Sequence, residues 1–314
     1  MSTNSEVTYS CEDYAQSANT LFHFMSNSDY LKQILINKAI VPRYCIENIE
    51  YLNISNDSGI FKEVAILQKC FCDIPFHKLT EEFELSGVGM EFNSLSEEEK
   101  LVLKKNNTHP EYYGKYAIAL SKMWGENRNL QPIHYLNDKS LYTSEFNSIF
   151  NMGMNDDSIL PEYTNDMLNR LAFCKPIRGI MKRTIKNNKT GIRNIEFYKN
   201  FHDEKEWRYV PSQKVLEDLG MEKVIANPNM LANRDIIFRI NKSLETDKYN
   251  ELWLKYNYDD IRYIVVPDLY SRKDLINTII NIPEKQFDNQ SEAAIQKYIL
   301  ISKILVWEEV RKDW

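Results

Sequence analysis

Two glutamates spaced two positions apart are the residues of this chain that most directly point to chemistry. Glu204 and Glu206 open the stretch 204–211, which we predict to be a short strand. Side chains alternate between the two faces of a strand, so both carboxylates should point the same way. Like charges placed side by side repel, whereas a reaction with a cationic transition state would use them. The pair is therefore the candidate catalytic centre.

A histidine near the N-terminus is the second candidate. His23 lies in the apolar stretch Leu21–Ser26, which we predict to be a strand. Asn27 then caps a predicted helix whose apolar residues recur at a spacing near 3.6. A strand-borne histidine early in the chain and a strand-borne Glu-x-Glu pair late in it resemble the residue pattern of ADP-ribosyltransferases.

The chain as a whole also resembles the AbiGi-like abortive-infection proteins of bacterial phage defence. Four stretches between about residues 20 and 212 carry this resemblance by their order and spacing: His23–Ser26, Cys70–Pro75, Tyr113–Gly125 and Glu204–Pro211. The first stretch is also similar to the opening of transferases from bacterial toxin systems, where a strand ends in a His-apolar-Thr/Ser pattern. Met25 departs from that pattern, because many such transferases carry a threonine there.

The resemblance implies that NAD is the substrate. Cleavage of the nicotinamide–ribose bond passes through an oxocarbenium-like state, which Glu206 would stabilise. Glu204 would orient or deprotonate the acceptor, and His23 would position the adenosine ribose. The remaining candidates would contact the dinucleotide: Ser26 beside the histidine, Arg43 or Arg208 at the pyrophosphate, and Phe71, Tyr113 or Tyr116 stacked on the nicotinamide.

Each of these residues also has a structural interpretation. His23 alone is typical of a satisfied histidine at a strand end. Glu204 and Glu206 alone are typical of solvated charges that discourage edge pairing, with Arg208 as their partner across one face. The strands around Phe71 and Tyr116 are typical of a buried core. Only the occurrence of all these motifs together, in this order, favours a catalytic function over a structural role.

The elements that would position these residues predict an α+β fold. Strands and helices do not alternate regularly, which disfavours a doubly wound parallel sheet. We predict one domain over residues 1–314, with an ADP-ribosyltransferase-like split mixed or antiparallel sheet and a helical insertion at about 140–185. A strand is predicted at Asp235–Ile240, and a long helix at Ser291–Val310 closes the chain.

The composition of the chain further narrows the functional classes to which the protein could belong. The net charge of −6 disfavours a dominant nucleic-acid surface, although residues 175–193 form a basic stretch. Glycine is scarce, with nine residues, and no Rossmann or P-loop pattern occurs. Five cysteines and a polar N-terminus predict a cytoplasmic protein, and no stretch is long enough to span a membrane. The scattered histidines do not predict a metal site, so no metal is expected.

These observations lead to two hypotheses of different classes. The first is an NAD-dependent ADP-ribosyltransferase toxin of an abortive-infection or toxin–antitoxin system, which modifies RNA, DNA or protein and is held by a cognate antitoxin. The second is a non-catalytic binding, antitoxin or sensor module of a phage-defence pair. A nuclease would need a cluster of metal-binding carboxylates, which the sequence does not show.

Overall fold

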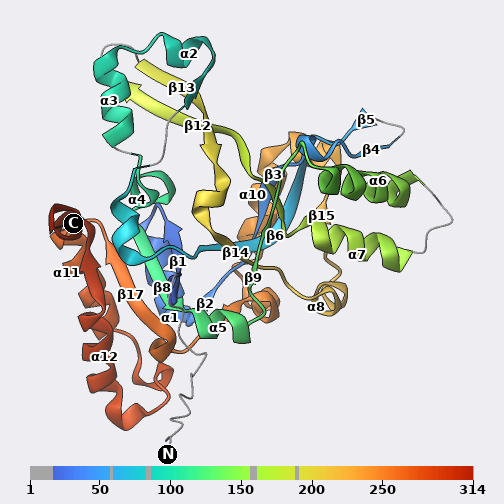
Figure 1. Ribbon diagram of the computed structural model, residues 1–314. Helices are drawn as coiled ribbons and strands as arrows, with labels where there is room; N and C mark the ends of the chain where they lie inside the picture. Colours follow the sequence, from blue (N-terminus) through green and yellow to red (C-terminus); the bar gives the residue numbers. More distant parts are fainter. Residues whose placement is uncertain are drawn as a thin grey trace, which may run out of the picture.

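The computed structural model describes residues 17–56, 59–82, 86–105, 107–155, 161–187 and 191–313. Its described part contains both helices and a large mixed sheet, which confirms the α+β class (Figure 1). The elements that position the candidate residues all belong to this sheet or flank it.

The N-terminal strand lies in the middle of the main sheet. In the described residues this sheet has nine strands, and seven of them follow one path, β18-β17-β8-β1-β6-β14-β9. Their bounds are Ile304–Val306, Ile261–Val266, Tyr116–Ser121, Thr20–Met25, Glu63–Cys72, Glu206–Tyr209 and Gln131–Pro132. Neighbours on this path are antiparallel except β17 and β18, which are parallel. The sheet therefore joins segments from both ends of the chain.

Strand β6 connects two halves of the sheet. Its C-terminal end pairs with β1 on one side and β14 on the other, both reaching Cys72. Its N-terminal part instead pairs with β3 (Arg43–Asn48) and β15 (Val224–Ile225). The ten-residue strand thus pairs with different strands along its length, and the sheet divides at the middle of β6.

Alternation along the central strands separates two hydrophobic layers. Leu21 and Ile118 face one core with α1 (Ser28–Asn37), α11 (Leu269–Ile280) and α12 (Ala293–Ser302). Phe22 and Ala117 face the opposite core, which Trp307 of α13 (Trp307–Asp313) closes. This is the period of two that apolar strands buried on both faces require. Helices α11 and α12 lie side by side along one flank of the molecule (Figure 1).

The other half of β6 is also buried on both faces. Val64 and Ile66 pack with α6 (Leu141–Asn155) and α7 (Pro161–Leu171). Ala65 and Leu67 pack on the opposite side with three short helices: α8 (Gln213–Asp218), α9 (Pro228–Ala232) and α10 (Arg234–Ser243).

A long antiparallel hairpin projects from the body of the molecule (Figure 1). It consists of β12 (Arg178–Asn187) and β13 (Gly191–Asn200), with β7 (Ser86–Val88) added at the edge of β13. Helices α2 (Gly89–Asn93) and α3 (Glu97–Lys105) lie at its far end. Most of the basic stretch 175–193 therefore belongs to this hairpin.

Short elements complete the described chain. The strands are β2 (Ala39–Ile40), β4 (Ser55–Asn56), β5 (Gly59–Ile60), β10 (His134–Leu136), β11 (Cys174–Pro176) and β16 (Leu254–Lys255). The α-helices are α4 (His109–Tyr113) and α5 (Lys122–Asn127). The 3₁₀ helices are η1 (Glu50–Leu52), η2 (Phe76–Thr80), η3 (Phe201–Glu204), η4 (Asp247–Leu252), η5 (Tyr258–Asp260), η6 (Glu284–Gln286) and η7 (Gln290–Glu292).

Three expectations about these elements need correction. The segment Asp235–Ile240 is part of helix α10 and not a strand, because Asn233 caps it and its apolar residues at helical spacing face the core. The segment Ser291–Val310 is not one helix, because Ile304–Val306 leave α12 to pair with β17. Within 140–185, the helices end at Leu171 and strands follow.

Candidate functional site

The two glutamates do not lie on one strand. Glu204 is the last residue of η3, whereas Glu206 is the first residue of β14. Lys205 between them adopts a left-handed conformation with φ of 42°, which turns the chain from the helix into the strand. Both glutamates are 4% exposed. The expectation of an exposed pair, catalytic or solvated, is therefore wrong: β14 lies between β6 and β9, and both carboxylates are inside the protein.

Three cations compensate the charge of the pair. Nζ of Lys175 donates to Oε2 of Glu204 at 2.7 Å and to Oε2 of Glu206 at 2.8 Å. Nζ of Lys199 donates to Oε1 of Glu204 at 2.7 Å, and Nε of Arg208 donates to Oε1 of Glu206 at 2.6 Å. All four carboxylate oxygens thus accept a charge-assisted hydrogen bond. We call these five residues the buried ion cluster.

The cluster continues into β3 and the turn that follows α7. Arg208 also donates to Oε1 of Glu47 at 3.0 Å and to the carbonyl oxygen of Ala172 at 2.8 Å. Gln68 donates to the same carboxylate oxygen of Glu47 at 2.7 Å. The prediction that Arg208 is a structural partner of the glutamates agrees with this geometry.

The electrostatics keep the cluster ionised. Burial alone would raise the pKa of Glu206, but the charges of Arg208 and Lys175 outweigh it and hold this pKa well below its usual range. Burial alone would likewise lower the pKa of Lys175, but the carboxylates of Glu206 and Glu204 raise it well above its ordinary value. Both glutamates are therefore anions at neutral pH, with their oxygens already occupied.

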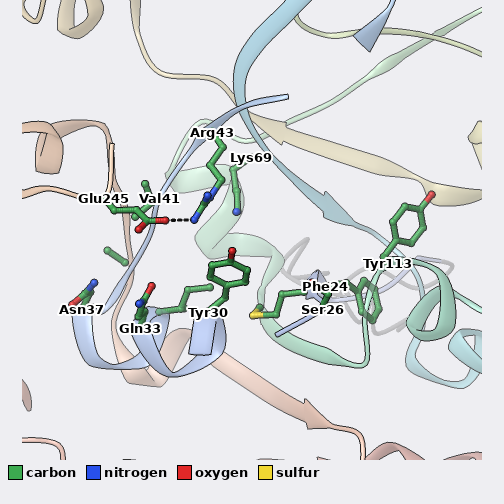
Figure 2. A pocket seen from close by; sticks show the side chains of 13 residues that line it. Phe24, Ser26, Tyr30, Gln33, Asn37, Val41, Arg43, Lys69, Tyr113 and Glu245 are labelled. Atoms are coloured by element: carbon green, nitrogen blue, oxygen red, sulfur yellow. Dashed lines mark hydrogen bonds and ion pairs between the residues drawn. The ribbon is translucent and has the colours of Figure 1, made fainter. Parts of the chain in front are cut away.

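A cavity of about 510 Å³ lies at the end of β1 and the start of α1 (Figure 2). Three of the predicted cofactor-binding residues line it: Ser26, Arg43 and Tyr113. Arg43 forms an ion pair with Glu245 and stacks over the ring of Tyr30, 5.2 Å from its centroid. Lys69 reaches into the same cavity beside Arg43 (Figure 2).

The other predicted residues lie outside the cavity lining. His23 bonds through Nδ1 to the carbonyl oxygen of Cys70 at 3.0 Å, and burial lowers its pKa well below the ordinary value, so it is neutral. Phe71 is fully buried against Trp124. The hydroxyl of Tyr116 lies 3.2 Å from that of Ser271. The structure therefore divides the expected site between a half-buried histidine, a cavity and the buried ion cluster.

Tyr113 connects the cavity with the cluster. Its side chain lines the cavity, and its hydroxyl donates to Glu204 and accepts from Lys199. Gly114 follows it with φ of +121°, and a Cβ at Gly114 would lie 2.2 Å from the carbonyl carbon of Met25. Only glycine lets the end of α4 approach β1 so closely.

Sequence reasoning missed the lysines that matter most. Lys199 ends a buried alternation, Ile195–Phe197–Lys199, so the period of two along β13 places its side chain inside. Lys175 was grouped with a basic surface stretch, and Lys69 was not singled out. Their roles depend on contacts between residues far apart in the chain, which no local pattern encodes.

No described group of three or more His, Cys, Asp or Glu residues could hold a metal ion. Within the described ranges, no helix is long and apolar enough to cross a membrane.

Comparison with known proteins identifies the family. A family model described as "Putative abortive phage resistance protein AbiGi, antitoxin" matches residues 100–267. The curated "Abortive phage resistance protein AbiGi" of Lactococcus lactis subsp. cremoris is 35% identical over 286 residues, which cover 88% of this chain and 100% of that protein. The chain belongs to the AbiGi family. No solved structure matches it significantly.

Membership of the AbiGi family corrects the main functional expectation. The interpretation as an ADP-ribosyltransferase toxin is wrong, because the family description is that of an antitoxin in abortive phage resistance. The alternative, a non-catalytic antitoxin module, fits that description better. The AbiGi-like resemblance itself is confirmed. An ADP-ribosyltransferase-like sheet and the use of NAD stay predictions.

Proposed function

We propose that this chain is the antitoxin of an abortive phage-resistance pair and that it neutralises a cognate toxin by binding it. The observation that carries the proposal is the antitoxin description of the AbiGi family model, which spans residues 100–267. The partner is therefore a toxin, and not the antitoxin expected from the sequence.

The geometry of the glutamate pair supports a binding role. A catalytic carboxylate must reach its substrate, whereas Glu204 and Glu206 are buried and bonded to Lys175, Lys199 and Arg208. Exposing either one would separate buried ion pairs, which costs several kcal/mol, about 3–5 for the loss of one partner. The cluster is thus suited to hold β11, β13 and β14 together.

Co-expression with the toxin of the same system tests the proposal. Bacteria that express the toxin alone should stop growing, and cells that also express this chain should continue to grow. The purified proteins should elute together in size-exclusion chromatography. Lys182→Met serves as the control variant in both assays, because it changes a residue of the hairpin whose side chain is 75% exposed.

Two results would contradict the antitoxin role. One is growth arrest caused by this chain alone, without any toxin. The other is failure of the folded chain to restore growth or to form the complex. Circular dichroism of the same preparation establishes that the chain is folded.

A further inference from the structure

The cavity lined by Arg43 and Lys69 has the chemistry of an anion site. Its charged lining residues are two cations, Arg43 and Lys69, against one carboxylate, Glu245. Glu245 is already paired with Arg43 and with Lys242. A positive pocket on a chain with a net charge of −6 is a local departure from the composition of the protein.

Lys69 is the residue on which the assignment of an anion site mainly depends. Among the described residues, no carboxylate or other acceptor is bonded to its ammonium group, and its nearest charged neighbour in the cavity is another cation, Arg43 (Figure 2). Burial, together with the positive charge of Arg43, lowers the pKa of Lys69 to about 8. A half-buried ammonium group without a counter-ion costs stability, and a bound anion would reduce that cost.

The remaining walls are suited to a flat polar molecule. Figure 2 shows Tyr113 and Phe24 on one side of the lining of the cavity, and Gln33 and Asn37 on the other. Tyr30 lies across from the two cations. Aromatic faces stack on a heterocyclic base, and amides at the opposite end can donate to phosphate oxygens. A volume of about 510 Å³ lies in the range of small-molecule sites, roughly 300–1,000 Å³.

We propose that this cavity binds a free nucleotide, with its phosphates on Lys69 and Arg43 and its base against the aromatic end. The site is independent of the antitoxin role, since it is tested by direct binding without the toxin. Tyr113 places the ligand next to the buried ion cluster, because its hydroxyl is bonded to Glu204 and Lys199.

Isothermal titration calorimetry of the full chain tests the site. The probes are ADP, inorganic pyrophosphate and adenosine. ADP should bind at least about tenfold more tightly than pyrophosphate, because only ADP fills the aromatic end, and adenosine should bind weakest. Lys69→Met should weaken ADP binding by about tenfold or more, since one charge-assisted contact is lost.

Two further variants make the test specific. Glu245→Gln removes the carboxylate that competes for Arg43, so ADP binding should become tighter. Lys182→Met, outside the cavity, should bind ADP as the natural chain does. Lys69→Met should also remain folded, because an apolar side chain replaces an uncompensated half-buried charge.

Several outcomes would overturn the proposal. These are no binding of ADP at millimolar concentration by the folded chain, undiminished binding by Lys69→Met, or pyrophosphate binding as tight as that of ADP. Tighter binding of a 5′-phosphorylated RNA oligomer than of ADP would assign the cavity to a nucleic-acid end instead.

Discussion

Nε of Arg208 donates a hydrogen bond to Oε1 of Glu206 over 2.6 Å, and both side chains are buried. A contact of this kind contributes to the fold only while both partners are present. Removal of one partner leaves the other as a buried charge without a counter-ion. This destabilises the fold more than replacement of both partners does. The predictions for the cluster follow from this asymmetry.

Glu206→Gln should destabilise the protein by about 3–5 kcal/mol, because Arg208 and Lys175 lose the charge that compensates them. Urea unfolding at neutral pH measures the loss. Glu196→Gln is the matched control, since Glu196 forms an ion pair with Lys182 on the exposed hairpin and should cost under about 1 kcal/mol. Equal midpoints for Glu206→Gln and the natural chain would contradict the structural role.

The stability from Glu206 should disappear in acid. Its pKa in the folded chain lies below the ordinary value of 4.5, because the charges of Arg208 and Lys175 outweigh burial. A lowered folded pKa gives stability that is present above the unfolded pKa and lost as pH falls through the folded one. The stability difference between the natural chain and Glu206→Gln should therefore shrink below about pH 4.5. Chemical denaturation at a series of pH values measures it, and a difference that grows in acid would reverse the assigned sign.

Nucleotide binding should weaken as pH rises past about 8, the value to which burial lowers the pKa of Lys69. Loss of the proton removes a cation from the cavity. The nearby thiols of Cys45 and Cys70 have raised pKa values because they are buried, so they stay neutral in this range. Titrations with ADP between about pH 7 and 9.5 should show the decline. In Lys69→Met the profile should be flat, and a decline of equal size in that variant would assign the effect elsewhere.

Gly114→Ala should destabilise the chain by about 2 kcal/mol or more and should impair the cavity. Its φ of +121° is strained for any residue with a side chain, and a Cβ would overlap the backbone of Met25. Gly59→Ala separates the two causes, because Gly59 has a similar φ of +117° but no atom within 4 Å of the added Cβ. Thermal unfolding should show a larger loss for Gly114→Ala, and equal losses would mean that the clash is relieved.

The central strands could be predicted because their signal is local. Tyr116–Ser121 and Ile261–Val266 are short apolar runs bounded by polar residues, and both form strands at the heart of the sheet. Helices α6 and α7 lie within the helical insertion predicted at about 140–185, although the helices end at Leu171. The strand prediction for Asp235–Ile240 was wrong, because a short β-branched run fits both the period of a strand and that of a helix. The packing of Ile237 in the core favours the helix.

The candidate site was harder to predict, because its geometry depends on one unusual backbone residue and on distant partners. Lys205 carries no sequence signal for a left-handed conformation, so Glu204 and Glu206 were assigned to one strand. The cations that neutralise them come from β11, β13 and β14, as much as 31 positions away. The predicted cofactor residues Ser26, Arg43 and Tyr113 do meet in one cavity, while Phe71 belongs to the core and His23 is half-buried outside the cavity lining.

The central position of β1 determines when the chain can fold during its synthesis. Residues 20–25 are synthesised before both of their partners, Glu63–Cys72 and Tyr116–Ser121, and the second partner follows about a hundred residues later. The sheet is completed only when Ile304–Val306, near the C-terminus, pair with β17. Premature termination would release fragments with exposed strand edges, which are prone to aggregation and proteolysis.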